Sequence, residues 1–146
     1  MTILTSRVLE FDDSSQVYEE YFSRGWTDGL PIIPPTKKRV EECLNEAHYS
    51  PADIIGTEPT KGRVISAEKV AINSVMAGCL PEYFPVLVAA VEAMCEPEFN
   101  LHAITASTMG AAVLLVVCGP IVSEIGVNSG VSARVGSDSE RNIIDK

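Results

Sequence analysis

Apolar residues recur at helical spacing in four segments of the chain, and each segment opens with a residue that suits a helix start. In the first segment, valine, tyrosine and phenylalanine side chains share one face behind a serine, and a glycine follows. Proline opens the fourth segment, where its fixed φ angle suits the first helical turn. The pattern predicts helices over residues 14–24, 36–48, 66–78 and 81–94.

A different pattern follows residue 96. Residues 101–107 (LHAITAS) could form one strand, and residues 111–118 (AAVLLVVC) predict a second. The second run is uncharged throughout, as in a strand of a parallel sheet that is covered on both faces. A Gly-Pro pair and the run 121–125 then predict a tight turn and a short helix. These features predict an α/β fold in which a small, mostly parallel sheet is flanked by helices.

The length of 146 residues predicts a single α/β domain over residues 1–146. Within it we expect a helix plus a proline-rich loop over 1–35, a helical part over 36–96, a strand and βα part over 97–130, and a tail over 131–146. Residues 50–63 show no stable periodicity and are interpreted as a connector. Because so small a sheet leaves its edges uncovered, we expect a second protein subunit as partner.

The charge pattern restricts the partners further. Twenty acidic residues stand against eleven basic ones, and no Lys or Arg occurs between Val70 and Ala133. Nucleic acid and acidic membrane surfaces both require clustered basic residues, so we expect neither as a partner. The uncharged stretch 103–122 is interrupted by serine, threonine, glycine and proline, so it is not interpreted as a membrane span.

The cysteine spacing excludes two common uses of cysteine. Cys43, Cys79, Cys95 and Cys118 include no CxxC pair, which argues against a zinc ribbon and against a redox dithiol. The N-terminal residues also lack the pattern of a secretory signal. We therefore expect a cytoplasmic protein with free thiols.

Cys79 is the main candidate for chemistry. It lies between Gly78, where one helix is predicted to end, and Pro81, where the next is predicted to begin. Amides of the second helix would stabilise a thiolate, whereas carbonyls of the first helix and nearby Glu82 would oppose it. We interpret Cys79 as the most reactive thiol and as a nucleophile or soft ligand, with His102 or Glu82 moving a proton. An inert core cysteine and a core histidine are the alternatives.

Three residues are candidates for binding a substrate. Lys69 and Asn73 are four positions apart and share one helix face, and Lys69 is the last cation before the long stretch without basic residues. Lys69 could therefore meet an anionic group or a buried acid, although a solvated helix face is the alternative. Asp28 lies in the loop WTDGLPIIPPT, where it could bond its own backbone in a turn or form part of a lid or pocket wall.

Three sequence blocks resemble those of an uncharacterised bacterial family that includes thiol or selenothiol proteins. The blocks are GWTDGLPIIPPT, AEKVAINSVMAGCLPEYFPVLVAAVEAM and FNLHAITAST, within about residues 25–130. The resemblance implies that the defining blocks hold Asp28, Lys69, Asn73, Cys79, Glu82, Tyr83 and His102. It adds Tyr83 to the substrate-binding candidates. Longer members of the family continue beyond the GVNSG turn, which implies that this chain is one subunit of a split enzyme.

These observations predict a subunit of a hetero-oligomeric cytoplasmic enzyme, with lyase or hydrolase chemistry on a small molecule at an interface pocket. A non-catalytic subunit that stabilises a partner enzyme is the alternative. A single-metal site that uses Cys79 and His102 is a third interpretation, but two ligands are too few to support it. The sequence does not identify a cofactor.

Overall fold

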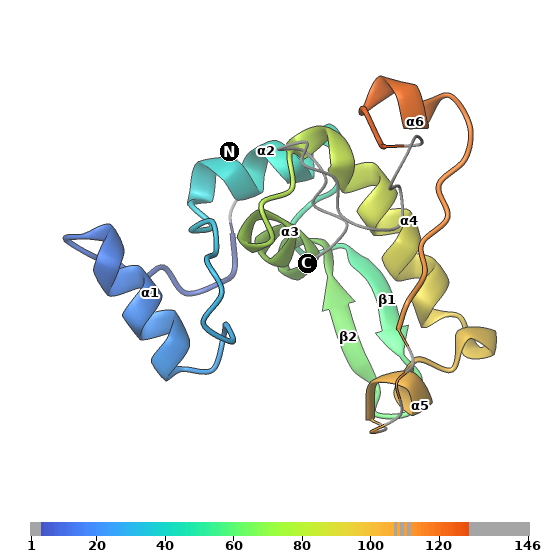
Figure 1. Ribbon diagram of the computed structural model, residues 1–146, viewed down its shortest axis with the longest axis horizontal. Helices are drawn as coiled ribbons and strands as arrows, with labels where there is room; N and C mark the ends of the chain where they lie inside the picture. The colour runs from blue at the N-terminus through green and yellow to red at the C-terminus, as the bar shows by residue number, and fades with distance from the viewer. Residues whose placement is uncertain (1–3, 107, 109, 111, 129–146) are drawn as a thin grey trace.

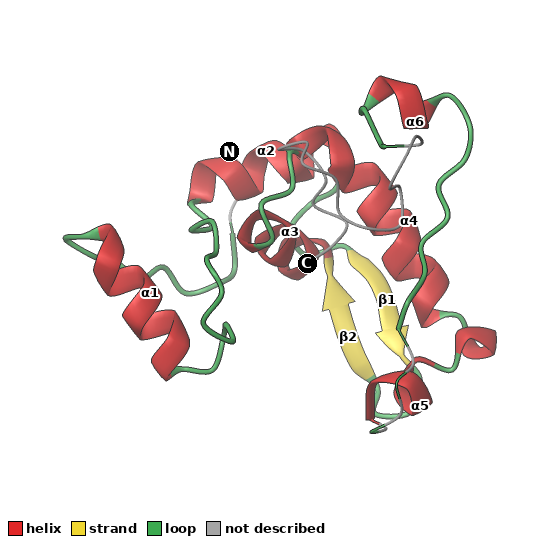
Figure 2. Cartoon of the chain, viewed as in Figure 1, coloured by secondary structure: helices red, strands yellow, loops and turns green. Residues whose placement is uncertain are grey.

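The computed structural model describes residues 4–106, 108, 110 and 112–128 of the chain. In chain order its elements are α1 (Ser14–Ser23), α2 (Lys37–Glu46), β1 (Ile54–Glu58), β2 (Arg63–Ser66), α3 (Ala67–Met76), η1 (Pro81–Tyr83), α4 (Phe84–Cys95), η2 (Pro97–Phe99), α5 (Leu101–Ala106) and α6 (Ile121–Glu124). The label η marks a 3₁₀ turn, and Figures 1 and 2 show the arrangement. Within these ranges, no helix has the length and apolar character that crossing a bilayer requires.

The four helices predicted from apolar spacing are confirmed as α1 to α4. Thr36 and Ser66 take the extended N-cap conformation before α2 and α3, and Asp13 does so before α1. The fourth helix begins later than predicted, because Pro81–Tyr83 form a 3₁₀ turn and α4 starts at Phe84. None of these three side chains makes a capping hydrogen bond, so local apolar spacing accounts for the helical half of the fold.

The predicted fold class is wrong, because the sheet in the described part of the chain is an antiparallel hairpin rather than a mostly parallel sheet. Strand β1 pairs with β2, from Ile54 opposite Ser66 to Glu58 opposite Arg63. This hairpin falls largely in the segment that was interpreted as a connector. Its strands have five and four residues, and the register shifts between Ile54 and Gly56. Alternation that short and irregular does not mark a strand in a sequence.

Neither of the two strands predicted after residue 100 is present where the structure describes residues 101–106 and 112–118. Leu101–Ala106 is helix α5, and the described residues 112–118 have no regular secondary structure. Asn100 has a φ of 54° and ends η2, and its carbonyl accepts a hydrogen bond from the N–H of Ala103 in the new helix. A run of seven residues is too short for its spacing to separate helix from strand. The short helix after the Gly-Pro pair is confirmed as α6, and the predicted tail lies outside the described residues.

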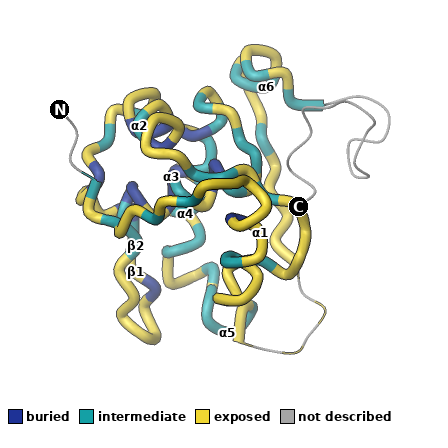
Figure 3. The backbone as a smooth tube through the Cα atoms, turned by 90° about the vertical axis from the view of Figure 1, so that its left-hand side faces the viewer, coloured by how far each residue is buried: buried dark blue, intermediate teal, exposed yellow. Residues whose placement is uncertain are grey.

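The hydrophobic core is shared by α2, α3, α4 and the hairpin. Its buried residues are Val40, Cys43, Leu44, Ile55, Ala67, Val70, Ala71, Val75, Phe84 and Val88. Figure 3 shows buried positions gathered in these central elements, whereas the segment that leads to α6 is mostly exposed. Helix α1 lies at the periphery in Figure 1. The surfaces of α3 that face α1 and α4 are the places where hollows remain.

Candidate functional site

Two neighbouring hollows share helix α3 as a wall. The first, which we call the basic groove, has a volume of about 600 Å³, and Arg7, Arg24, Lys37 and Lys69 are among the residues that line it. The second, which we call the thiol cavity, has a volume of about 380 Å³ and is lined by residues that include Cys79 and Cys95. Lys69 and Asn73 line both hollows. Helix α3 therefore connects the two sites.

The thiol cavity lies between α3 and α4 and is mainly apolar. Leu87, Val91 and Met94 of α4 line one side, and Val70 and Ala77 belong to the opposite side. The structure thus brings together three of the residues proposed from the sequence, since Cys79, Lys69 and Asn73 all line this cavity.

The backbone turn after α3 positions Cys79. Gly78 has a φ of 83°, and its N–H donates to the carbonyl of Val75 at 2.9 Å. The N–H of Cys79 donates to the carbonyl of Ser74 at 2.9 Å, which closes the end of the helix. Burial raises the pKa of the Cys79 thiol above its ordinary value of 9.0. The sequence left open whether neighbouring groups would stabilise the thiolate of Cys79. In the structure, burial favours the protonated thiol over the thiolate.

The proposed proton-transfer residues do not line the cavity that contains this thiol. His102 on α5 is half-buried and lines neither hollow. Its electrostatic neighbour is Glu58 of β1. Burial alone would raise the pKa of Glu58, but hydrogen bonds from Thr60 and Lys61 and the charge of His102 bring it below its ordinary value. The structure therefore places His102 beside a carboxylate of the hairpin and does not pair it with Cys79.

The remaining candidates on η1 are also separate from both hollows. Glu82 is exposed and Tyr83 is half-buried, and neither of them lines the groove or the cavity. A metal ion has no obvious ligands either, because the described residues contain no group of three His, Cys, Asp or Glu side chains that could hold one.

Asp28 stabilises a turn, as one of the two interpretations of its loop predicts. Its carboxylate accepts a hydrogen bond from the N–H of Leu30 at 3.0 Å, and the Thr27 hydroxyl donates to the Leu30 carbonyl at 3.1 Å. The same loop also forms part of a pocket wall, because Trp26 and Pro35 line the basic groove. Asp28 itself lines neither hollow.

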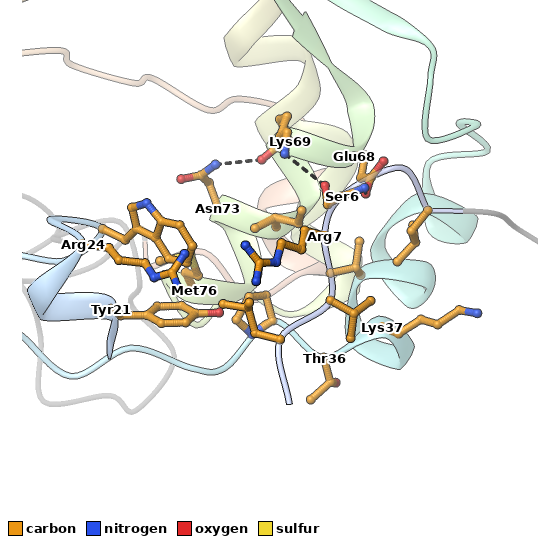
Figure 4. A pocket seen from close by; sticks show the side chains of 17 residues that line it. Ser6, Arg7, Tyr21, Arg24, Thr36, Lys37, Glu68, Lys69, Asn73 and Met76 are labelled. Atoms are coloured by element: carbon orange, nitrogen blue, oxygen red, sulfur yellow. Dashed lines mark hydrogen bonds between the residues drawn. The ribbon is translucent and has the colours of Figure 1, made fainter. Parts of the chain in front are cut away.

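Side chains from four separate segments meet in the basic groove (Figure 4). Arg24 at the end of α1 lies over the ring of Trp26, 5.0 Å from its centroid, and forms an ion pair with Glu20. Tyr21 packs its ring edge to face with Trp26 at 5.2 Å. Burial raises the pKa of Tyr21 above its ordinary value of 10.0, so its hydroxyl remains a neutral donor. These contacts build an aromatic and cationic end of the groove.

Helix α3 holds the N-terminal segment that forms the other side of the groove. The Glu68 carboxylate accepts hydrogen bonds from the N–H of Thr5 at 2.8 Å, from the Thr5 hydroxyl at 2.6 Å and from the N–H of Ser6 at 2.8 Å. The Lys69 ammonium donates to the Ser6 hydroxyl at 3.0 Å, and the Asn73 amide donates to the Lys69 carbonyl at 2.8 Å. The Asn73 side chain therefore bonds the helix backbone at Lys69, whereas the Lys69 ammonium bonds Ser6.

Glu68 remains ionised in this position. Burial alone would raise its pKa, but the hydrogen bonds from Ser6 and Thr5 outweigh that effect and lower the pKa to about 2. Lys69 therefore lies beside a buried acid in sequence, but its ammonium contacts a hydroxyl rather than that acid.

Sequence reasoning did not identify Arg7, Tyr21, Arg24 or Trp26 as site residues. No motif links them, because they are brought to α3 by folding of the N-terminal segment and α1. The nearest signal was the rigid loop that begins with Trp26.

The basic groove is equipped for binding, whereas the thiol cavity offers an apolar chamber with a protonated thiol. No histidine or carboxylate among the described residues lines the thiol cavity, and Lys69 is its one ionisable nitrogen group among them. Comparison of the chain with models of known protein families, with curated proteins and with solved structures finds no match.

Proposed function

We propose that this chain is one subunit of a hetero-oligomeric cytoplasmic enzyme that carries out lyase or hydrolase chemistry on a small molecule. The observation that carries this proposal is the thiol cavity, where Lys69, Asn73 and Cys79 line one mainly apolar space. Apolar hollows with a few polar groups are the usual form of small-molecule sites. In this proposal Cys79 contacts the substrate, and the partner subunit supplies a base.

The need for a partner is supported by the segment that leads to α6. In residues 112–118, Leu114 is 80% exposed and Val116 is 73% exposed. No backbone hydrogen bond involves this segment within the described part of the chain. An uncharged, β-branched segment with free N–H and C=O groups is suited to pairing with a strand of another chain. The partner subunit would cover it.

Substitution of Cys79 in the assembly purified with its partner tests the proposal. We expect Cys79→Ser and Cys79→Ala to lose activity while the assembly stays intact, because the thiol would contact the substrate. Thr57→Ser is the control, since Thr57 is exposed on β1 and lies outside both hollows and outside residues 112–118. Full activity in Cys79→Ala would show that this thiol only fills space.

A non-catalytic subunit that stabilises its partner is the second candidate. Two observations favour it. Burial raises the pKa of Cys79, which makes the thiol a poorer nucleophile, and the apolar segment 112–118 is left uncovered for a partner. This alternative predicts that Cys79 variants keep activity, whereas Leu114→Asp reduces recovery of the partner. Val64→Asp is the control, because Val64 is 60% exposed on β2 and lies outside the segment.

A further inference from the structure

We propose that the basic groove is a binding site for a small organic anion, in which Arg7 and Lys69 hold a carboxylate or phosphate group. The groove shares Lys69 and Asn73 with the thiol cavity, but its occupation does not require the enzymatic activity proposed above. It lies between the N-terminal segment, the end of α1 and the exposed edge of α3 (Figure 4).

Arg7 is the first reason to expect an anion. Figure 4 shows its guanidinium extending into the middle of the groove. Among the described residues it forms no ion pair and no hydrogen bond. A guanidinium presents five N–H donors in a planar fork that matches the oxygens of carboxylate and phosphate. All of these donors are free for a ligand.

Lys69 is the second cation without a carboxylate partner. Its ammonium contacts the neutral hydroxyl of Ser6, and no acidic side chain of the described chain lies within ion-pair distance. Glu68 is the acidic residue that lines the groove, but it is fully buried and engaged by three donors of the N-terminal segment. Two positive charges are therefore left without a carboxylate partner.

The other two cations of the groove differ from this pair. Arg24 forms an ion pair with Glu20, and the Lys37 ammonium forms one with Glu41, with 3.8 Å between Nζ and Oε1. Figure 4 shows the Lys37 ammonium directed away from the hollow. These ion pairs are local to α1 and α2, so they leave Arg7 and Lys69 as the charges that a ligand would meet.

The groove also offers contacts for an apolar part of the ligand. Trp26 is 49% exposed and lines the hollow, as do Ile72 and Met76 of α3. The Tyr21 hydroxyl points toward Arg7 in Figure 4 and has no hydrogen-bond partner among the described residues. A volume of about 600 Å³ admits a small molecule. The chemistry thus fits a short apolar body that ends in one oxyanion.

Trp26 is the only tryptophan of the chain, so its fluorescence reports on this groove. The full chain is titrated with butyl phosphate, with butyrate and with 1-butanol, which share an alkyl group and differ in charge. We expect a saturable change with at least one of the two anions and none with 1-butanol. The anion that binds with the higher affinity shows whether the natural ligand is a phosphate ester or a carboxylate.

Two variants test the residues. Arg7→Gln should weaken anion binding roughly tenfold to a hundredfold, because it removes a charged hydrogen-bond donor. Arg7→Lys keeps the charge but loses the planar fork. Its affinity for the anion should lie between that of the wild type and that of Arg7→Gln. Lys38→Gln is the matched control, since Lys38 is an exposed cation of α2 that does not line the groove. The proposal is overturned if neither anion saturates the signal, or if Lys38→Gln weakens binding as much as Arg7→Gln.

Discussion

Glu68 of α3 and Thr5 of the N-terminal segment are 63 residues apart in the chain and are joined by two hydrogen bonds to the same carboxylate oxygen. The second oxygen of Glu68 accepts the N–H of Ser6. Because Glu68 is fully buried, its charge depends on these donors for the hydrogen bonds that water would otherwise supply. One side chain therefore holds one side of the basic groove against α3.

Glu68→Gln should loosen this attachment. A glutamine places its NH₂ group opposite one of the donors of the N-terminal segment, so at least one hydrogen bond is lost. We expect the free energy of unfolding to fall by roughly 1.5–3 kcal/mol, the usual contribution of a hydrogen bond to a charged group. Urea titration measures this change, and faster trypsin cleavage after Arg7 would report a local release instead. Glu46→Gln, an exposed change on α2, is the control and should alter neither quantity.

The same carboxylate should make stability depend on pH in the acid range. The pKa of Glu68 is lowered from 4.5 to about 2 in the folded chain. A lowered folded pKa means that the stabilisation is complete above pH 4.5 and is lost as the pH falls toward 2. Urea titrations between pH 2 and 7 should thus show the difference between wild type and Glu68→Gln shrinking below pH 4.5. A difference that stays constant down to pH 2 would contradict this assignment.

Gly56 should not tolerate a side chain. A Cβ atom at this position would lie 2.5 Å from Sγ and 2.8 Å from Cβ of Cys95, which packs across the hairpin. We expect Gly56→Ala to lower the free energy of unfolding by about 1–3 kcal/mol, as overpacking usually does. Combining it with Cys95→Ala removes the sulfur and should recover part of the loss. Gly110→Ala is the control, because nothing lies near its Cβ position, and an equal loss there would refute the packing argument.

The order of thiol alkylation should follow exposure. Cys118 is exposed, whereas Cys43 is buried and its pKa is raised to about 11, mainly by burial. A limiting dose of iodoacetamide on the isolated chain, followed by peptide mapping, should label Cys118 first and Cys43 last. This order replaces the sequence-based prediction that Cys79 reacts first, because burial also raises the pKa of Cys79.

The partner subunit should change this order. If it covers residues 112–118, Cys118 will react more slowly in the assembly than in the isolated chain. Equal labelling rates of Cys118 in both preparations would argue against that interface. The four thiols are free in the structure, so each can be followed separately.

The helices and the sheet differ in how far they could be predicted from the sequence. Thr36 and Ser66 are N-caps with apolar residues at helical spacing behind them, and these signals act between neighbours along the chain. The hairpin depends instead on pairing between Ile54–Glu58 and Arg63–Ser66, and its short strands carry no regular alternation. The apolar run 112–118 has strand composition, but no strand lies beside it in the described chain.

The sequence by itself determined the order of the main helices and the helix junction that holds Cys79, and it offered the turn at Asp28 as one of two interpretations. Only the tertiary structure decided which chemical groups meet. It placed His102 beside Glu58 and outside the cavity that Cys79 lines, and it brought Arg7 into the same hollow as Lys69. The physical reason is the range of the interactions: caps, turns and helical spacing act within a few residues, whereas the packing of distant segments against α3 has no local signature in the chain.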